Sequence, residues 1–273
     1  MTRVFEGNAL RFSHVGAALE VVLNRKPCNE IGLESLSELE MLAAYIRSGA
    51  EGARAVIFYS EIPTGFSAGA DLKALYAGIV ERKQKGITVE AAAKEVRSFV
   101  DRIHAVFNTF DSAPMTTIAA THGVVFGGGF ELALTCDVII ADKTARFCFP
   151  ELRLGLVPGF GGIPRLNRDV GNAVTRDLLL TGRSLNATRA NAVGLVSQLV
   201  AKGEALTAAR SLAAQSARFD AKTTSAAKAF MKPMPLDALE REKELFTAMF
   251  TSPVVEAALA KFFHSTDVRP YLP

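Results

Sequence analysis

The chain has 273 residues, enough for one large domain or for a domain with an appendage. Hydrophobic residues make up 49% and charged residues 22% of the sequence, which is ordinary for a globular protein and excludes a disordered chain. Lys and Arg together number 31 and Asp and Glu 28, so the net charge of +3 excludes a strongly basic protein, and we expect no nucleic-acid partner.

Apolar and alternating runs in the N-terminal part predict β-strands. The predicted strands cover residues 9–13, 17–24, 53–59, 116–120 and 137–141. Two helical patterns, at 35–48 and 90–110, lie between them, because apolar residues there recur on one helical face. Strands that alternate with helices in this way indicate α/β layers joined by crossover connections.

Beyond about residue 173 the sequence predicts mainly helices. The helical segments are expected at 172–182, 187–196, 205–217 and 235–250, with breaks at Gly182, Gly194, Gly203 and Pro235. No flexible linker separates these segments from the α/β part. We therefore expect the C-terminal helices to pack on the α/β core or on another subunit.

Cysteine usage and apolar segments favour a cytoplasmic protein without a membrane partner. The three cysteines, Cys28, Cys136 and Cys148, form no CxxC pair, and we expect them to be reduced. The N-terminus lacks an apolar core followed by a cleavage site, so no secretory signal is predicted. The longest apolar region, 115–141, is interrupted by glycines and charged residues, which predicts a buried segment rather than a membrane span. The four histidines have no ligand-like spacing, so we expect no metal site.

Three segments combine glycines with polar residues. They read FSAGADLKAL at 66–75, HGVVFGGGFELALTCD at 122–137 and FPELRLGLVPGFGGIPRL at 149–166. A single segment of this kind is most often only a turn between a strand and a helix. None of them matches the GxGxxG pattern of dinucleotide sites, the Gly-Lys-Ser/Thr of a phosphate loop or the GxSxG of serine hydrolases. These three functional classes are therefore weakly supported.

Two of these segments place a glutamate, Glu131 or Glu151, among apolar residues. Burial raises the pKa of a carboxyl group, which suits proton transfer near neutral pH, although an ion pair inside the fold is the structural alternative. A backbone N–H at a glycine-hinged turn, such as Gly128 at the start of a helix, can donate to an oxygen that gains negative charge. Together these features predict proton transfer beside a stabilised enolate.

The ordered set of motifs resembles the crotonase family, the enoyl-CoA hydratase/isomerase superfamily. The resemblance rests on SAGADL, HGVVFGGGFELALTCDVIIA and PELRLGLVPGFGGIPRL, and extends to LNRKPCNEIG and LLLTGRSLNATRANAVGLVSQLV, so that it covers residues 23–200. It implies an α/β fold, a crotonase-like spiral of ββα units over residues 1–200 that holds the active site. It also implies a C-terminal helical trimerisation region over 201–273, and hence a homotrimer or a dimer of trimers.

The same resemblance implies the substrate and the site. The substrate would be an acyl-CoA thioester, so that coenzyme A is part of the substrate and no separate cofactor is needed. Its carbonyl oxygen would lie between the main-chain N–H groups of Ala70 and Gly128. Glu131 and Glu151 would act on one water molecule, which the N–H of Gly159 would hold. Coenzyme A would run past Lys26, Cys28, Ala68, Asp71, Leu72 and Lys73.

The presence of both glutamates favours an enoyl-CoA hydratase, a hydro-lyase of fatty acid metabolism. An enoyl-CoA isomerase or an acyl-CoA hydrolase of the same family is the alternative enzyme. A third possibility is a non-catalytic assembly module, which a pocket filled by Phe130 or Phe160 would favour. The bulky Phe126, Phe130 and Phe160 and the sequence GGIPRL depart from the family pattern, and they leave the acyl group of the substrate open.

Overall fold

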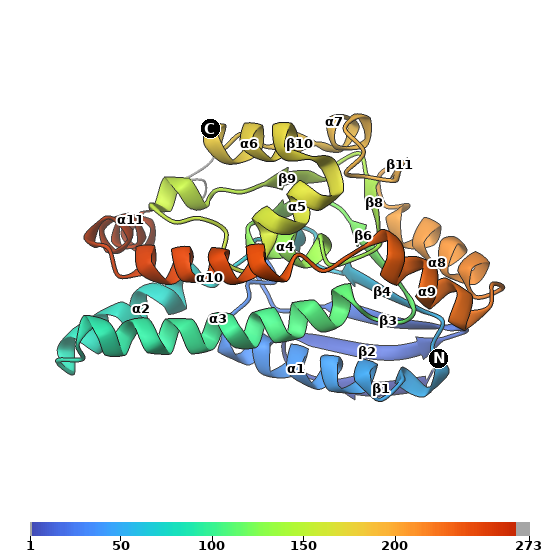
Figure 1. Ribbon diagram of the computed structural model, residues 1–273, viewed down its shortest axis with the longest axis horizontal. Coiled ribbons are helices and arrows are strands. Elements are labelled where there is room, and N and C mark those ends of the chain that lie inside the picture. The colour runs from blue at the N-terminus through green and yellow to red at the C-terminus, as the bar shows by residue number, and fades with distance from the viewer. Residues whose placement is uncertain (1, 266–273) are drawn as a thin grey trace.

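The computed structural model describes residues 2–265, whose largest element is a seven-stranded sheet (Figure 1). Its strands, in spatial order, are β1 (Thr2–Glu6), β2 (Leu10–Val15), β3 (Ala18–Leu23), β4 (Ala55–Ser60), β6 (Thr116–Thr121), β8 (Val138–Asp142) and β11 (Gln198–Val200). The first three pair antiparallel, as consecutive hairpins do, and every later pair is parallel. Parallel neighbours need crossover connections, which the intervening helices supply.

A second sheet of four short strands lies next to the first. Its order is β10 (Leu185–Asn186), β9 (Arg146–Cys148), β7 (Val124–Phe126) and β5 (Gly65–Ser67). The strands β5, β7 and β9 each follow a strand of the large sheet, namely β4, β6 and β8. Each turn of the chain therefore contributes one strand to each sheet before the next helix or loop begins. This arrangement is the spiral of repeated ββα units that the family resemblance implied.

The helices surround these sheets. They are α1 (Leu33–Arg47), α2 (Leu72–Gln84), α3 (Val89–Asp111), α4 (Gly128–Ala133), α5 (Gly162–Val170), α6 (Asn172–Thr181), α7 (Ala187–Ala192), α8 (Ala205–Ser216), α9 (Ala221–Met231), α10 (Leu236–Phe250) and α11 (Pro253–His264). Two short 3-10 helices, η1 (Ala50–Gly52) and η2 (Glu151–Leu154), complete the set. The last of these matters for the site, because it begins at one of the two predicted glutamates.

Both faces of the large sheet are buried, and the strand β4 shows how. Ala55, Ile57 and Tyr59 point to one face, where they contact small side chains of α8, namely Ala205, Ala209 and Ala213. Val56 and Phe58 point to the other face and join the main core with α1 and α3. This alternation follows from the two-residue period of a strand.

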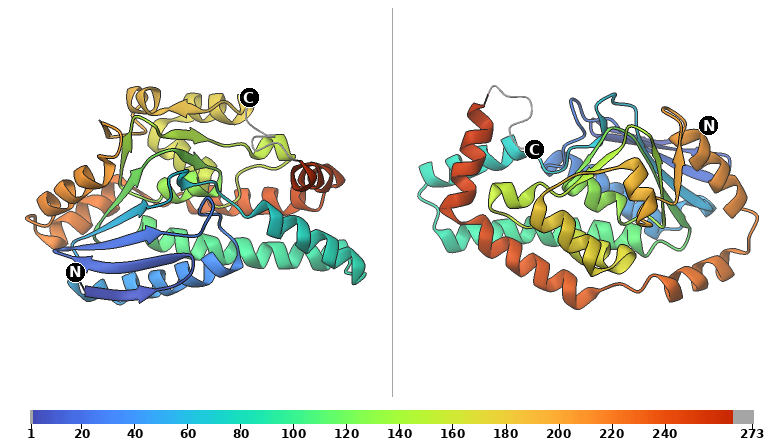
Figure 2. Two further views of the ribbon diagram at one scale, coloured as in Figure 1. Left: turned by 180° about the vertical axis from the view of Figure 1, so that it is seen from behind. Right: turned by 90° about the horizontal axis from the view of Figure 1, so that it is seen from above.

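The C-terminal helices fold back over the same chain. Figures 1 and 2 show α10 running alongside α3 across the molecule, while α11 lies against α2. No single helix within residues 2–265 is long and apolar enough to cross a bilayer, and α10 with α11 passes that test only as a pair bent by 74°. The C-terminal region thus brings α10 against α3 and α5.

The structure contains the predicted strands and, apart from the end of the one at 187–196, the predicted helices. The elements β1, α2, α9 and α11, with 5, 13, 11 and 12 residues, were not predicted. The five predicted strands correspond to β2, β3, β4, β6 and β8, with ends shifted by one or two residues. Strands of two or three residues, such as β5 and β9, were not predicted, because so short a run shows no periodicity. The predicted helix at 187–196 is wrong at its end. Helix α7 stops at Ala192, and Gly194 then adopts a φ of +84° that turns the chain towards β11.

A buried ionic cluster ties three helices together. The carboxylate of Asp111, at the end of α3, lies 2.7 Å from Arg165 Nε of α5 and 2.8 Å from Lys232 Nζ, directly after α9. Arg168 of α5 approaches the same carboxylate to 3.1 Å. Burial alone would raise the pKa of Asp111, but the charges of Lys232, Arg165 and Arg168 outweigh it and lower that pKa. The cluster holds α5 in a defined place against α3.

We predict that Asp111→Asn destabilises the fold by about 3 to 5 kcal/mol at neutral pH, because it leaves buried cations without their carboxylate. Since the pKa of Asp111 is lowered by folding, its stabilisation is present above the unfolded-state pKa of about 4 and is lost as the pH falls below that value. Urea unfolding at several pH values measures both effects.

The matched control is Asp169→Asn, which removes a more exposed carboxylate that also contacts Arg168. It should change the unfolding free energy by less than about 1 kcal/mol. Equal effects of the two substitutions would contradict the structural role of Asp111.

Candidate active site

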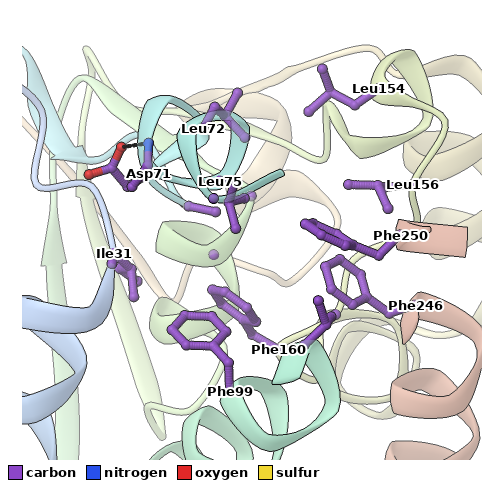
Figure 3. Close-up of a pocket in the computed structure, with 18 of the residues that line it drawn as sticks. Ile31, Asp71, Leu72, Leu75, Phe99, Leu154, Leu156, Phe160, Phe246 and Phe250 are labelled. Carbon is purple, nitrogen blue, oxygen red and sulfur yellow. Dashed lines mark hydrogen bonds between the residues drawn. The ribbon is translucent and has the colours of Figure 1, made fainter. Parts of the chain in front are cut away.

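A cavity of about 490 Å³ opens beside the ends of the strands, between α2, α3 and α10. Its wall is mainly apolar, and Figure 3 shows Phe99 and Phe160 next to each other with Phe246 and Phe250 beside them. Further apolar side chains come from α2, α3, η2 and the segment after η2: Leu72, Leu75, Val96, Leu154 and Leu156. A wall of this kind suits an apolar group of a ligand.

Glu131 and Glu151 both line this cavity, although 20 positions separate them in the sequence. Glu131 lies on α4, which follows β7, and Glu151 begins η2, which follows β9. Since β7 and β9 are parallel neighbours, the segments that follow them lie side by side. Neither glutamate forms an ion pair with any residue between 2 and 265. The structure does not show the ion-pair alternative for either residue.

The carboxylate of Glu131 is held by backbone N–H groups alone. Its side chain is 2% exposed, and Oε1 accepts hydrogen bonds from the N–H of Phe160 at 2.7 Å and from the N–H of Gly162 at 2.9 Å. Burial raises the pKa of Glu131 to about 7, while the two backbone hydrogen bonds oppose that rise. Glu131 is therefore poised to gain or lose a proton near neutral pH.

Glu151 differs from Glu131 in its partners. Its Oε2 atom is buried and has no hydrogen-bond partner among the described residues. Burial raises the pKa of Glu151 well above its ordinary value, and the nearby negative charge of Glu131 raises it further. A carboxyl oxygen without a donor favours the protonated form. The two glutamates thus have unequal environments in one cavity.

The predicted oxyanion donors, Ala70 and Gly128, also line the cavity. Neither N–H donates to an acceptor within residues 2–265. A Cβ atom at Gly128 would lie 3.5 Å from the Ala70 nitrogen and 2.7 Å from the ring of Phe160. The two N–H groups therefore border one space, and Gly128 keeps that space open. Two unengaged donors at one point are what an oxyanion requires.

Gly69 makes this approach possible. It has a φ of +91°, and a Cβ atom there would lie 2.7 Å from the Phe126 carbonyl oxygen and 2.9 Å from the Gly128 nitrogen. Any other residue would push the segment before α2 away from the start of α4. In the glycine triplet, a Cβ atom at Gly127 would lie 2.7 Å from Glu151 Oε1. The triplet thus leaves room for the neighbouring backbone, ring and carboxyl group.

The residues predicted to contact coenzyme A divide into two groups. Ala68, Asp71 and Leu72 line the cavity, whereas Lys26, Cys28 and Lys73 do not belong to its wall as described for residues 2–265. The side chain of Asp71 already has structural partners, because it accepts from the N–H of Ala74 at the start of α2 and pairs with Arg25 at 2.6 Å. The side chains of Lys26 and Lys73 are exposed to solvent.

The two phenylalanines that could have filled the pocket lie in different surroundings. Phe130 lies in the core, with its ring stacked on that of Phe149 at 4.6 Å, and does not line the cavity. Phe160 lines the cavity next to Phe99, at a ring distance of 6.0 Å, and leaves its volume open. Filling of the pocket by either ring, which would have favoured a non-catalytic protein, is not seen.

One further acidic residue beside the site, Glu242 on α10, was missed by the sequence analysis. It is 4% exposed and accepts from the N–H groups of Gly161 at 2.6 Å and Ile163 at 2.8 Å. The sequence did contain a signal for this residue. Leu239, Glu242 and Phe246 fall on one face of the helix, so Glu242 interrupts an apolar stripe. Gly159, the predicted water-binding residue, lies on the cavity wall next to this segment.

Comparison with known proteins points to one family. The profile of the enoyl-CoA hydratase/isomerase family matches residues 16–265. The chain is 38% identical over 186 residues to enoyl-CoA hydratase domain-containing protein 2, mitochondrial, of Homo sapiens, covering 68% of this chain and 59% of that protein. It is 39% identical over 151 residues to methylglutaconyl-CoA hydratase, mitochondrial, of Rattus norvegicus, covering 55% of this chain and 44% of that protein.

Solved structures share the fold. An enoyl-CoA hydratase/isomerase from Xanthobacter autotrophicus Py2 superimposes with a TM-score of 0.81 at 26% identity, covering 94% of this chain and 93% of that chain. The shared fold thus extends over nearly the whole of both chains. Against the two sequence relatives, the chain spans only 59% and 44% of their lengths.

The environment of Glu131 predicts a pH-dependent cost to stability. Because its folded-state pKa of about 7 lies above the ordinary value of 4.5, the stability of the protein should fall as the pH rises from about 4.5 to 7, by at most about 3 kcal/mol. Glu131→Gln removes this ionisation. The variant should therefore gain stability relative to the unmodified protein over that pH range, measured by urea unfolding.

Glu244→Gln, on the exposed side of α10, is the control and should leave the pH dependence unchanged. If the curves of unfolding free energy against pH run parallel for the unmodified protein and Glu131→Gln, Glu131 ionises in the folded protein as it does in water, and the prediction is wrong.

Proposed function

The chain belongs to the enoyl-CoA hydratase/isomerase family, and from that premise we propose that it is an enoyl-CoA hydratase. The proposed reaction adds water across the 2,3 double bond of an acyl-CoA thioester. The observation that carries the proposal is the meeting in one cavity of two carboxyl groups and two backbone N–H groups. The carboxyl groups are those of the buried Glu131 and the partly buried Glu151, which have no basic partner within residues 2–265, and neither N–H group has an acceptor there. An apolar acyl group would fit the apolar wall.

In the first part of the reaction the thioester carbonyl oxygen would accept hydrogen bonds from Ala70 and Gly128. Addition at C3 moves negative charge onto that oxygen and forms an enolate. Preorganised N–H donors stabilise this charge more than they stabilise the uncharged carbonyl, which lowers the barrier. The N-terminal end of α4, where Gly128 lies, adds a partial positive charge.

The unequal environments of the glutamates assign their roles. Both backbone hydrogen bonds to Glu131 use Oε1 and favour its ionised form, so Glu131 would take a proton from the water whose oxygen bonds to C3. Glu151, with Oε2 lacking a donor, would carry the proton that it delivers to C2. The product therefore carries a new hydroxyl group on C3 and a new hydrogen on C2. One proton passing from Glu131 to Glu151 then restores the starting state.

Two further parts of the site belong to the proposal. The N–H of Gly159 has no acceptor within residues 2–265 and lies on the cavity wall, where it could donate to the attacking water. Coenzyme A would leave the cavity past Ala68, Asp71 and Leu72 and continue towards the exposed Lys26 and Lys73, whose charges suit its phosphates.

We predict that the protein hydrates crotonyl-CoA or another 2-enoyl-CoA, seen as loss of the absorbance of the conjugated thioester. Glu131→Gln and Glu151→Gln should each lower kcat by roughly 10²- to 10⁴-fold, because each removes one proton-transfer group. An isomerase that uses Glu151 alone would largely retain its activity in Glu131→Ala. A hydrolase would release free coenzyme A, which a thiol reagent detects. No turnover on short, medium and aromatic enoyl-CoAs would contradict the proposal.

Gly128→Ala should lower kcat by roughly 10²-fold, because its methyl group would enter the space between the Ala70 nitrogen and the Phe160 ring and displace the carbonyl oxygen. Gly78→Ala is a matched control, since Gly78 also lines the cavity but a Cβ atom there meets only ordinary contacts with Arg82 at 3.6 Å. Equal activity of the two variants would show that the oxygen does not bind at Gly128.

A further inference from the structure

The segment of residues 159–163, which we call the 159–163 turn, has its N–H groups divided between two glutamates. The N–H groups of Phe160 and Gly162 donate to Glu131, as described above. Those of Gly161 and Ile163 donate to Oε1 and Oε2 of Glu242. Four consecutive N–H groups thus alternate between α4 and α10, and each carboxyl group receives two of them.

The carbonyl groups of the same turn are also bound. His104 of α3 donates from Nε2 to the Gly159 oxygen at 2.9 Å, and burial lowers the pKa of His104 to about 4, so the ring is neutral at pH 7. Arg165 Nη1 donates to the oxygens of Phe160 and Gly161, each at 3.2 Å. Both the N–H groups and the carbonyl groups of the turn are therefore held by side chains, which defines its position.

Helix α10 contacts the turn through one face. A Cβ atom at Gly159 would lie 2.4 Å from the ring of Phe246, and one at Gly161 would lie 2.8 Å from Leu239 Cδ2. Leu239, Glu242 and Phe246 are spaced as neighbours on one helical face. Glu242 supplies the only carboxyl group on this face within the described residues, and it points at the turn rather than at solvent.

We propose that Glu242 is a positioning residue for the hydration reaction. It binds the N–H groups of Gly161 and Ile163, which alternate with those that bind Glu131. It thereby fixes the two N–H groups that orient the Glu131 carboxylate, together with the backbone of Gly159, which lines the cavity. The expected effect of Glu242 on the reaction rate rests on the proposed function, whereas its expected effect on the 159–163 turn does not. Helix α10 is then part of the active centre and not only a cover for it.

The chemistry of a carboxylate suits this task. The N–H groups of Gly161 and Ile163 each donate to a different oxygen of Glu242, so both acceptor atoms of this carboxyl group are used. A glutamine offers one acceptor and a donor in its place. The charged groups that act on Glu242 are Glu131 of α4, whose charge opposes ionisation, and Arg165 of α5, whose charge favours it. Arg165 acts on Glu131 in the same direction, so one buried cation serves both carboxyl groups.

The test compares Glu242→Ala and Glu242→Gln with the exposed Glu244→Gln on the same helix. With crotonyl-CoA, Glu242→Ala should lower kcat about 10²-fold and change KM less than about threefold, because misplacing a catalytic group by about 1 Å has an effect of this size. Glu242→Gln keeps the shape and one acceptor, so it should retain more activity than Glu242→Ala. Glu244→Gln should behave as the unmodified protein.

Amide hydrogen exchange tests the turn without substrate. In Glu242→Ala, the N–H groups of Phe160 and Gly162, which do not contact Glu242, should exchange at least about tenfold faster, since they lose protection by local opening. Exchange in β4 should stay unchanged, which separates a local effect from general destabilisation. Glu242→Gln provides the same measurement should the alanine variant fail to fold.

The outcomes separate the inference from the proposed function. If the unmodified protein hydrates no enoyl-CoA, the proposed function fails, and hydrogen exchange alone decides whether Glu242 holds the turn. If hydration occurs and kcat in Glu242→Ala equals that of Glu244→Gln, the inference is wrong although the function stands. Unchanged exchange at Phe160 and Gly162 overturns the inference in either case.

Discussion

The buried carboxylate of Glu131 is bound by two backbone N–H groups and, within residues 2–265, by no cation, and the geometry around the cavity depends on this interaction. A bound cation would fix the ionised form and remove the group from proton transfer. Backbone donors satisfy the carboxylate while leaving its pKa near 7. Such donors must come from a turn that is itself held in place, which explains why His104, Arg165 and Glu242 all bind the 159–163 turn.

The sequence carried much of this arrangement. Alternating or helical runs predicted five strands of the large sheet and helices such as α1, α3 and α10, because each shows its period over enough residues. The strand β1 and the helices α2, α9 and α11 were not predicted. A glutamate among apolar residues, next to a glycine triplet, correctly indicated Glu131 as a buried carboxyl group. The second glutamate, Glu151, lies on the same cavity as expected from the motif order. Their catalytic roles stay predictions.

Other parts depend on contacts between distant positions, which local patterns do not show. Glu242 binds N–H groups about 80 positions earlier in the chain, and only the folding back of α10 brings them together. The helical pattern left open whether the C-terminal helices pack on their own core or on another subunit, because an apolar helical face fits either. Lys26 and Lys73 lie off the cavity wall, since exposed lysines extend into solvent and local sequence does not limit their direction.

Leu239, Glu242 and Phe246 reach the turn from the chain that also supplies Glu131 and Glu151, so the two glutamates proposed to transfer protons and the helix face that supports them belong to one polypeptide. Were such subunits to associate, the two glutamates would need no residue from a neighbour to meet in one cavity. A substitution on a surface between subunits would then not have to move either carboxyl group.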